Sequence, residues 1–117
     1  MPVNIRIDGD VVVLGNFARL MNDPRYVDAS WDIEGLLDEG HRNFILDLGG
    51  VRETGSTFLG LLMTLTRRIR RSGGEAALAN LTRQMEAFLL VEMQMEEFWD
   101  VFPSVPEGIA FFRRGSS

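Results

Sequence analysis

The feature that most constrains the fold is a short apolar strand signal followed closely by a long helix signal in the middle of the chain. Residues 43–48, Asn-Phe-Ile-Leu-Asp-Leu, form an apolar run that ends in Gly49 and Gly50. Such a run is typical of a strand in the centre of a sheet. Residues 56–71 then give the strongest helix pattern in the chain, with four arginines at the C-terminal end, where cations stabilise a helix. A buried strand followed by a helix favours the α/β class.

The rest of the chain continues this alternation after an initial hairpin. Residues 3–7 alternate apolar and polar and predict a half-buried strand, and a turn at Asp8-Gly9-Asp10 leads back into a buried strand. The remaining predicted elements are a strand at 11–14, a helix at 26–40 that Gly40 ends, a strand at 76–79 and a helix at 82–95 that Thr82 caps. Residues 98–102 predict a final short strand or the approach to it, and residues 106–114 predict a terminal helix.

The predicted order is therefore β-β-α-β-α-β-α-β-α, in a mixed sheet of about five strands with about four helices. We expect residues 1–114 to form a single domain and residues 115–117 to be a frayed tail. The apolar share of 45% is enough for an ordinary core.

Residue types that are absent or nearly absent exclude several kinds of chemistry. The chain has no cysteine, so disulfides, thiolate metal sites and cysteine nucleophiles are excluded. All 12 basic residues are arginine, which excludes a P-loop lysine and a Schiff-base lysine. The single histidine, His41, lies in a predicted loop and is interpreted as an exposed turn residue. We predict no catalytic residue, no metal and no cofactor, and do not expect an enzyme.

Net charge and hydropathy indicate which classes of partner and which cell compartment to expect. A net charge of −5 argues against nucleic acid or an anionic membrane as the main partner. The N-terminus has no apolar signal core, and no apolar run reaches membrane-spanning length, so we expect a cytoplasmic protein. Asp47 is placed where a receiver domain accepts phosphate, but the acidic pair and the lysine of that chemistry are missing, which excludes this class.

The junction between the central strand and the long helix is the one candidate site. A short loop leads to Ser56 and Thr57, where the helix begins. The first turn of a helix offers free backbone N–H groups and the positive end of the helix dipole. A hydroxyl group there is either an N-cap or a phosphorylation site, and the residues alone favour the N-cap.

Residues 44–51, Phe-Ile-Leu-Asp-Leu-Gly-Gly-Val, and residues 55–62, Gly-Ser-Thr-Phe-Leu-Gly-Leu-Leu, resemble the signature of STAS domains. These include the bacterial anti-sigma factor antagonists of the SpoIIAA and RsbV type. In the signature, a strand ends in Asp-Leu-x-x-Val, and Asp-Ser-Ser/Thr-Gly-Leu-Gly begins an apolar helix. The resemblance covers nearly the whole chain, with one extra residue in the third helix. The chain departs from the motif at Gly55, in place of Asp, and at Phe58, in place of Gly.

The resemblance implies a single STAS-like domain that acts as a partner-switching regulator of transcription. In the family, the serine after the motif Asp is phosphorylated by a serine kinase of the histidine-kinase-like ATPase type, which is also the anti-sigma factor. The unphosphorylated antagonist binds this kinase and frees the sigma factor, and a PP2C-type phosphatase resets the switch. The matching residue is Ser56, with Thr57 and Thr54 as fallback acceptors.

The partner-binding surface is expected around this serine. Its expected members are Glu53, Gly55, Ser56, Thr57, Phe58 and Leu61. Phe58 and Leu61 are expected to be exposed, since a docking domain would carry an apolar patch beside its switch residue. An acidic partner could also dock on the arginines at 67–71, and a partner could contact the apolar residues at 90–93.

Two other functions of STAS-like domains remain open. One is a non-enzymatic subunit bound to the ATPase of an ABC transporter, including the lipid-trafficking type, and the other is a stressosome-like scaffold. The departure at Gly55 is compatible with both. The sequence leaves monomer and homodimer open.

Overall fold

The computed structural model describes residues 4–17, 28–52 and 55–115, with the backbone alone for residues 28–31 and 115. The sheet has five strands in the order β1-β2-β3-β4-β5. They are β1 (Asn4–Asp8), β2 (Val11–Gly15), β3 (Asn43–Asp47), β4 (Glu75–Ala79) and β5 (Val101–Phe102). The pair β1 and β2 is antiparallel and the other neighbours are parallel, which confirms the predicted hairpin and mixed sheet.

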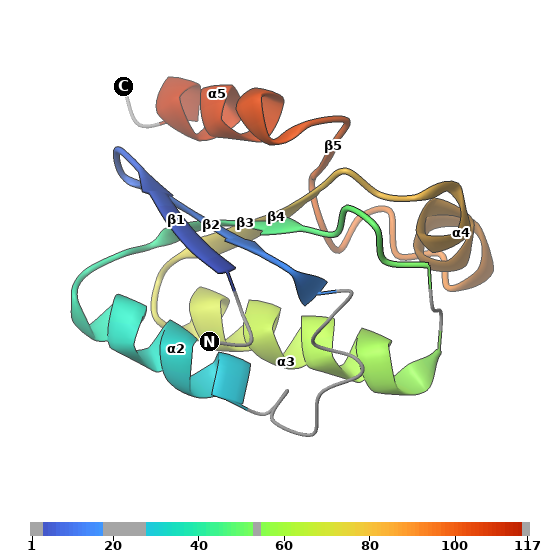
Figure 1. Ribbon diagram of the computed structural model, residues 1–117, viewed down its shortest axis with the longest axis horizontal. Helices are drawn as coiled ribbons and strands as arrows, with labels where there is room; N and C mark the ends of the chain where they lie inside the picture. The colour runs from blue at the N-terminus through green and yellow to red at the C-terminus, as the bar shows by residue number, and fades with distance from the viewer. Residues whose placement is uncertain (1–3, 18–27, 53–54, 116–117) are drawn as a thin grey trace.

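The helices cover the two faces of this sheet, as Figure 1 shows. Their bounds are α2 (Asp28–Asp38), α3 (Ser56–Arg71), α4 (Arg83–Glu86), the π-helix η1 (Ala87–Glu92) and α5 (Val105–Gly115). Helices α2 and α3 lie on one face and α5 lies on the other, while α4 lies beyond the end of β4 (Figure 1). The predicted element order is confirmed in the described residues, and the start of the first predicted helix at Tyr26 lies outside them.

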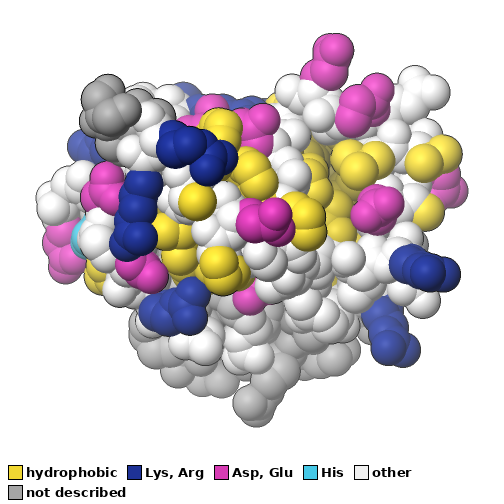
Figure 2. Space-filling view, turned by 90° about the horizontal axis from the view of Figure 1, so that it is seen from above, with side chains coloured by type: hydrophobic (Ala, Val, Ile, Leu, Met, Phe, Trp, Pro, Cys, Tyr) yellow, Lys and Arg dark blue, Asp and Glu magenta, His cyan; other side chains and the backbone are white. Residues whose placement is uncertain are grey.

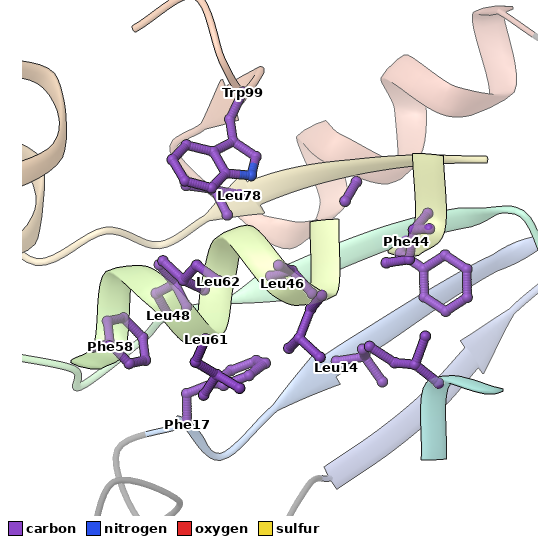
Figure 3. Close-up of a cluster of buried hydrophobic side chains, with 14 of the residues drawn as sticks. Leu14, Phe17, Phe44, Leu46, Leu48, Phe58, Leu61, Leu62, Leu78 and Trp99 are labelled. Carbon is purple, nitrogen blue, oxygen red and sulfur yellow. The ribbon is translucent and has the colours of Figure 1, made fainter. Parts of the chain in front are cut away.

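The main core lies between the sheet and the pair α2 and α3. Figure 3 shows side chains from β2, β3 and β4 pointing towards the apolar face of α3. Trp99 packs at the β5 end of this core, and its Nε1 donates a hydrogen bond to the Thr66 hydroxyl at 2.9 Å. Thr66 is fully buried, so this bond satisfies a polar group that could not reach water.

The second face of the sheet is covered by one helix, α5, and its core is smaller. It comprises Val11, Val13, Ile45, Ala77, Ala79, Val105, Ile109 and Phe112. Seen from the α5 side, Figure 2 shows hydrophobic side chains still visible between charged ones. An ion pair of 2.6 Å between Asp8 and Arg113 ties α5 to the hairpin. The predicted half-buried pattern of β1 is wrong at Ile7, which is 51% exposed because this edge strand is incompletely covered.

The ends of two predicted helices show how local sequence sets their bounds. Gly40 has φ 99°, and the bonds Gly40 N to Leu37 O and His41 N to Leu36 O end α2 as a Schellman motif. The third helix changes from α4 to the π-helix η1, in which each turn holds more residues.

Candidate functional site

The two hydroxyl residues of the junction are exposed at the first turn of α3. Ser56 begins the helix, and Thr57 follows it. The N-cap residue is Gly55, and no side chain forms a cap hydrogen bond at this end. The interpretation of Ser56 as an N-cap is therefore wrong: Ser56 is the first helical residue, the cap position is Gly55, and Leu59 N donates to Gly55 O at 3.1 Å. The Ser56 hydroxyl makes no hydrogen bond with the described residues.

The electrostatics of this first turn suit an anion. No acidic residue lies in the first turn of α3, and no described side chain occupies its free N–H groups. The positive end of the helix dipole is thus open to solvent beside the Ser56 hydroxyl. A phosphate group placed there would meet backbone donors rather than a carboxylate of the same turn. Glu53, a predicted member of the partner-binding surface, and Thr54, a predicted fallback acceptor, lie outside the described residues.

Asp47 fixes the start of the loop that leads to Ser56. Its Oδ1 accepts hydrogen bonds from Gly49 N and from Asn80 Nδ2, each at 3.0 Å. Asp47 ends β3 and Asn80 follows β4, so this carboxylate joins the carboxyl ends of two neighbouring parallel strands. The role of Asp47 is therefore to position the loop, which sequence analysis missed. The Asp-Leu-Gly-Gly pattern after a buried strand was the available signal.

Thr82 fixes the middle of the same loop. Its hydroxyl donates to Val51 O at 2.6 Å and accepts from Met85 N at 3.2 Å. Val51 N in turn donates to Leu48 O at 3.0 Å, which closes a turn. The predicted N-cap at Thr82 is confirmed, and the bond to Val51 shows that this cap also holds the loop before Ser56.

Replacing Thr82 with alanine is expected to lower the free energy of unfolding by about 2 kcal/mol, because one hydroxyl is lost both as a helix cap and as a loop anchor. Equilibrium urea unfolding would measure the change. Thr82→Ser is the matched control, since it keeps the hydroxyl and should lose less than half as much. Equal losses in the two variants would show that the methyl group, not the hydroxyl, holds the loop.

Phe58 and Leu61 do not form an exposed patch. The exposed fraction is 1% for Phe58 and 8% for Leu61, so the prediction that these side chains are exposed is wrong. Phe58 packs edge-on against Phe17 with ring centroids 6.4 Å apart. Figure 3 shows Phe58, Leu61 and Leu62 pointing into the core beneath the sheet. Because α3 turns this face inward, its first turn presents only Ser56, Thr57 and Gly60 to solvent.

The arginines at the other end of α3 have separate environments. Arg68 forms a forked hydrogen bond with Glu34 of α2, with 2.8 Å between Nη2 and Oε1, and this bond raises the pKa of the Arg68 guanidinium. Arg70 pairs with Glu75 at 2.7 Å. The other two, Arg67 and Arg71, are exposed.

The described residues contain neither a cluster suited to a metal ion nor a helix that could span a membrane. Within residues 4–17, 28–52 and 55–115, no group of three or more His, Asp or Glu side chains could hold a metal ion. His41 is only partly exposed, contrary to the prediction of an exposed turn residue, with its Nε2 3.7 Å from Glu39 Oε2. No helix in the described part of the chain is long and apolar enough to cross a membrane.

Comparison with known proteins supports the same architecture. The model of the STAS domain family matches residues 26–108. A crystal structure from Thermotoga maritima, described as a candidate anti-sigma factor antagonist, has a TM-score of 0.75 at 20% identity over 95% of this chain and 94% of that one. The structure of an anti-sigma-factor antagonist (STAS) domain protein from Planctomyces limnophilus has a TM-score of 0.73 at 20% sequence identity. The match covers 92% of this chain and 95% of that chain. The comparison with curated proteins found no match.

Proposed function

The chain belongs to the STAS domain family, and from this premise we propose that it is an anti-sigma factor antagonist controlled by phosphorylation of Ser56. The unphosphorylated protein binds a cytoplasmic serine kinase that is also an anti-sigma factor, and phosphate on Ser56 releases it. A PP2C-type phosphatase restores the binding form. The domain itself catalyses nothing, and it takes neither metal nor cofactor.

The observation that carries this proposal is the environment of the Ser56 hydroxyl. It is exposed at the first turn of α3, it caps nothing, and the helix dipole there is unopposed by an acidic residue of the same turn. An exposed hydroxyl is accessible to a kinase, and the phosphate would be tolerated by the free domain, with a dipole contribution below about 1 kcal/mol. The same phosphate would have to be desolvated at a partner interface.

The binding surface that we propose is polar at its centre. It comprises Gly55, Ser56 and Thr57, with Glu53 and Thr54 preceding them in the sequence. Phe58 and Leu61 support it from below by holding the first turn of α3 against the core. The bonds of Asp47 and Thr82 hold the described part of the loop, at Gly49 and Val51, so these residues need little ordering when a partner binds.

Affinity capture from the native cytoplasm, with phosphosite mapping of the bait, tests the proposal. We expect an anti-sigma kinase to be recovered with the unmodified bait, and phosphate to be found on Ser56 in the free pool. A Ser56→Ala bait is the matched control, which should recover the kinase but carry no phosphate at this position. Thr57 is the second acceptor that mapping would reveal.

The alternative functions give different results in the same experiment. Recovery of an ABC-transporter ATPase with an unphosphorylated bait would replace the switch with a transporter subunit. Recovery of a large assembly of STAS proteins would indicate a scaffold. Either result, with no phosphate on Ser56, contradicts the proposed function, and Gly55 in place of the motif Asp would then mark the loss of the switch.

A further inference from the structure

The C-terminal half of α3 carries four arginines, of which two are paired with carboxylates and two are exposed. Arg68 and Arg70 are paired with Glu34 and Glu75, respectively. Arg67 and Arg71 are exposed, and no ion pair joins either of them to another described residue. They stand four positions apart, so they occupy neighbouring places on one face of the helix. Two like charges in this arrangement repel each other, and no carboxylate of the described residues forms an ion pair with either of them.

These two arginines border a hollow of about 740 Å³. Its lining residues are Thr64, Arg67, Arg70, Arg71 and Phe98. Thr64 precedes Arg67 by three positions and Arg71 by seven, so one stripe of α3 forms a wall of the hollow. Phe98, which comes just before β5, forms the facing wall, so the hollow brings together residues far apart in the sequence.

The wall formed by Phe98 is held in place by several contacts. Arg70 Nη2 donates to Phe98 O at 2.5 Å, and the Arg70 guanidinium lies 4.8 Å from the centre of the Phe98 ring. The Phe98 ring packs edge-on against Trp99, with centroids 4.5 Å apart. Since Trp99 is bonded to the buried Thr66, the wall is anchored to the core. Arg70 is thus engaged internally, while Arg67 and Arg71 are available to a ligand.

The chemistry of this hollow suits an acidic peptide. Neighbouring side chains four positions apart on a helix have Cβ atoms about 5–6 Å apart, a spacing that two carboxylates of one short segment can match. Each guanidinium can bind a carboxylate with two parallel hydrogen bonds. The Phe98 ring provides an apolar surface for a side chain between the acids. In a chain of net charge −5, this local positive surface would orient an acidic partner.

We propose that this hollow, formed by Thr64, Arg67, Arg71 and Phe98, is a docking site for an acidic segment of a partner protein. It is separate from the surface at Ser56, because Thr64 and Arg71 follow Ser56 by 8 and 15 positions in α3, which is about 12 and 23 Å along the helix axis. In Figure 1, α3 runs across the lower half of the molecule, from its N-terminal end on the right to its C-terminal end left of centre. The proposal therefore does not depend on phosphorylation of Ser56.

Fluorescence anisotropy with a labelled peptide of repeated Glu-Glu-Leu tests the proposal on the full chain. We expect the peptide to bind, and Arg67→Gln/Arg71→Gln to weaken its affinity by about tenfold or more. Arg6→Gln/Arg83→Gln is the matched control, since it removes two exposed arginines from other surfaces and should change the affinity less than about twofold. Phe98→Leu, which keeps an apolar wall, should weaken binding less than the double arginine variant.

Five outcomes would overturn the proposal. The peptide could fail to bind, or its affinity could fall equally in the two double variants, which would indicate an effect of overall charge. Equal affinity for a Gln-Gln-Leu peptide would show that the arginines do not recognise the carboxylates. Displacement of the peptide by equimolar pyrophosphate would assign the hollow to a phosphate ligand instead. Dimerisation in sedimentation velocity that Arg67→Gln/Arg71→Gln abolishes would assign it to a second copy of this chain.

Discussion

Replacing Ser56 with aspartate is expected to abolish partner binding while the domain stays folded. The side chain lies exposed at the first turn of α3, where a carboxylate meets the positive end of the helix dipole. The free energy of unfolding should therefore change by less than about 1 kcal/mol and should not fall. In the complex, the same carboxylate would be buried at the centre of the proposed interface without a matching cation.

The size of the expected loss of partner affinity follows from the cost of desolvating this carboxylate. An unpaired charge buried at an interface costs about 2–5 kcal/mol, which corresponds to a factor of about 30 to several thousand in Kd. Calorimetric titration of the captured partner with the wild type and the variant would measure it. Because phosphoserine carries about −1.5 to −2 charges, the natural modification should be at least as effective as aspartate.

Two variants separate the charge from the loss of the hydroxyl. Ser56→Ala should bind the partner with an affinity within about threefold of the wild type, since one exposed hydroxyl contributes little. Thr57→Asp places a similar charge one position along the same exposed turn and shows how far the effect extends. Unchanged affinity in Ser56→Asp, with normal unfolding, would refute the switch whatever partner had been captured.

Sequence patterns predicted the order and type of the elements well, because each strand is bounded by turn residues and each helix has its own apolar period. The helix at residues 56–71 was predicted with the bounds that the structure gives it. The exception at Ile7 has a tertiary cause, since strand periodicity indicates which residues share a face but not whether anything covers that face.

The candidate site was predicted in position but not in detail. The hydroxyl of Thr82 reaches Val51, 31 positions earlier, and Arg68 reaches Glu34, 34 positions earlier. Local spacing contains no information about such long-range pairs. The sequence therefore provides no reason to separate the four arginines at 67–71 into paired and exposed ones. Their division into two paired and two unpaired cations required the fold, and the proposed docking site depends on that division.

The burial of Phe58 is the clearest case in which the fold overrules the sequence. From the sequence alone, this apolar residue, two positions after Ser56, is interpreted as a partner contact. It is 1% exposed and packs against Phe17, because α3 turns this face towards the core. Phe58 should therefore affect stability far more than partner affinity.

Replacing Phe58 with alanine is expected to lower the free energy of unfolding by about 3–5 kcal/mol, since the loss of a buried ring leaves a cavity as well as exposed apolar surface. Urea unfolding would measure this loss, which is a large fraction of the about 5–15 kcal/mol typical of a domain. Phe58→Leu is the control for binding: it should lose less stability, remain folded and keep the partner affinity of the wild type within about threefold. A Phe58→Leu protein with wild-type stability and strongly weakened partner binding would instead make Phe58 a direct contact, which would require the first turn of α3 to open when the partner binds.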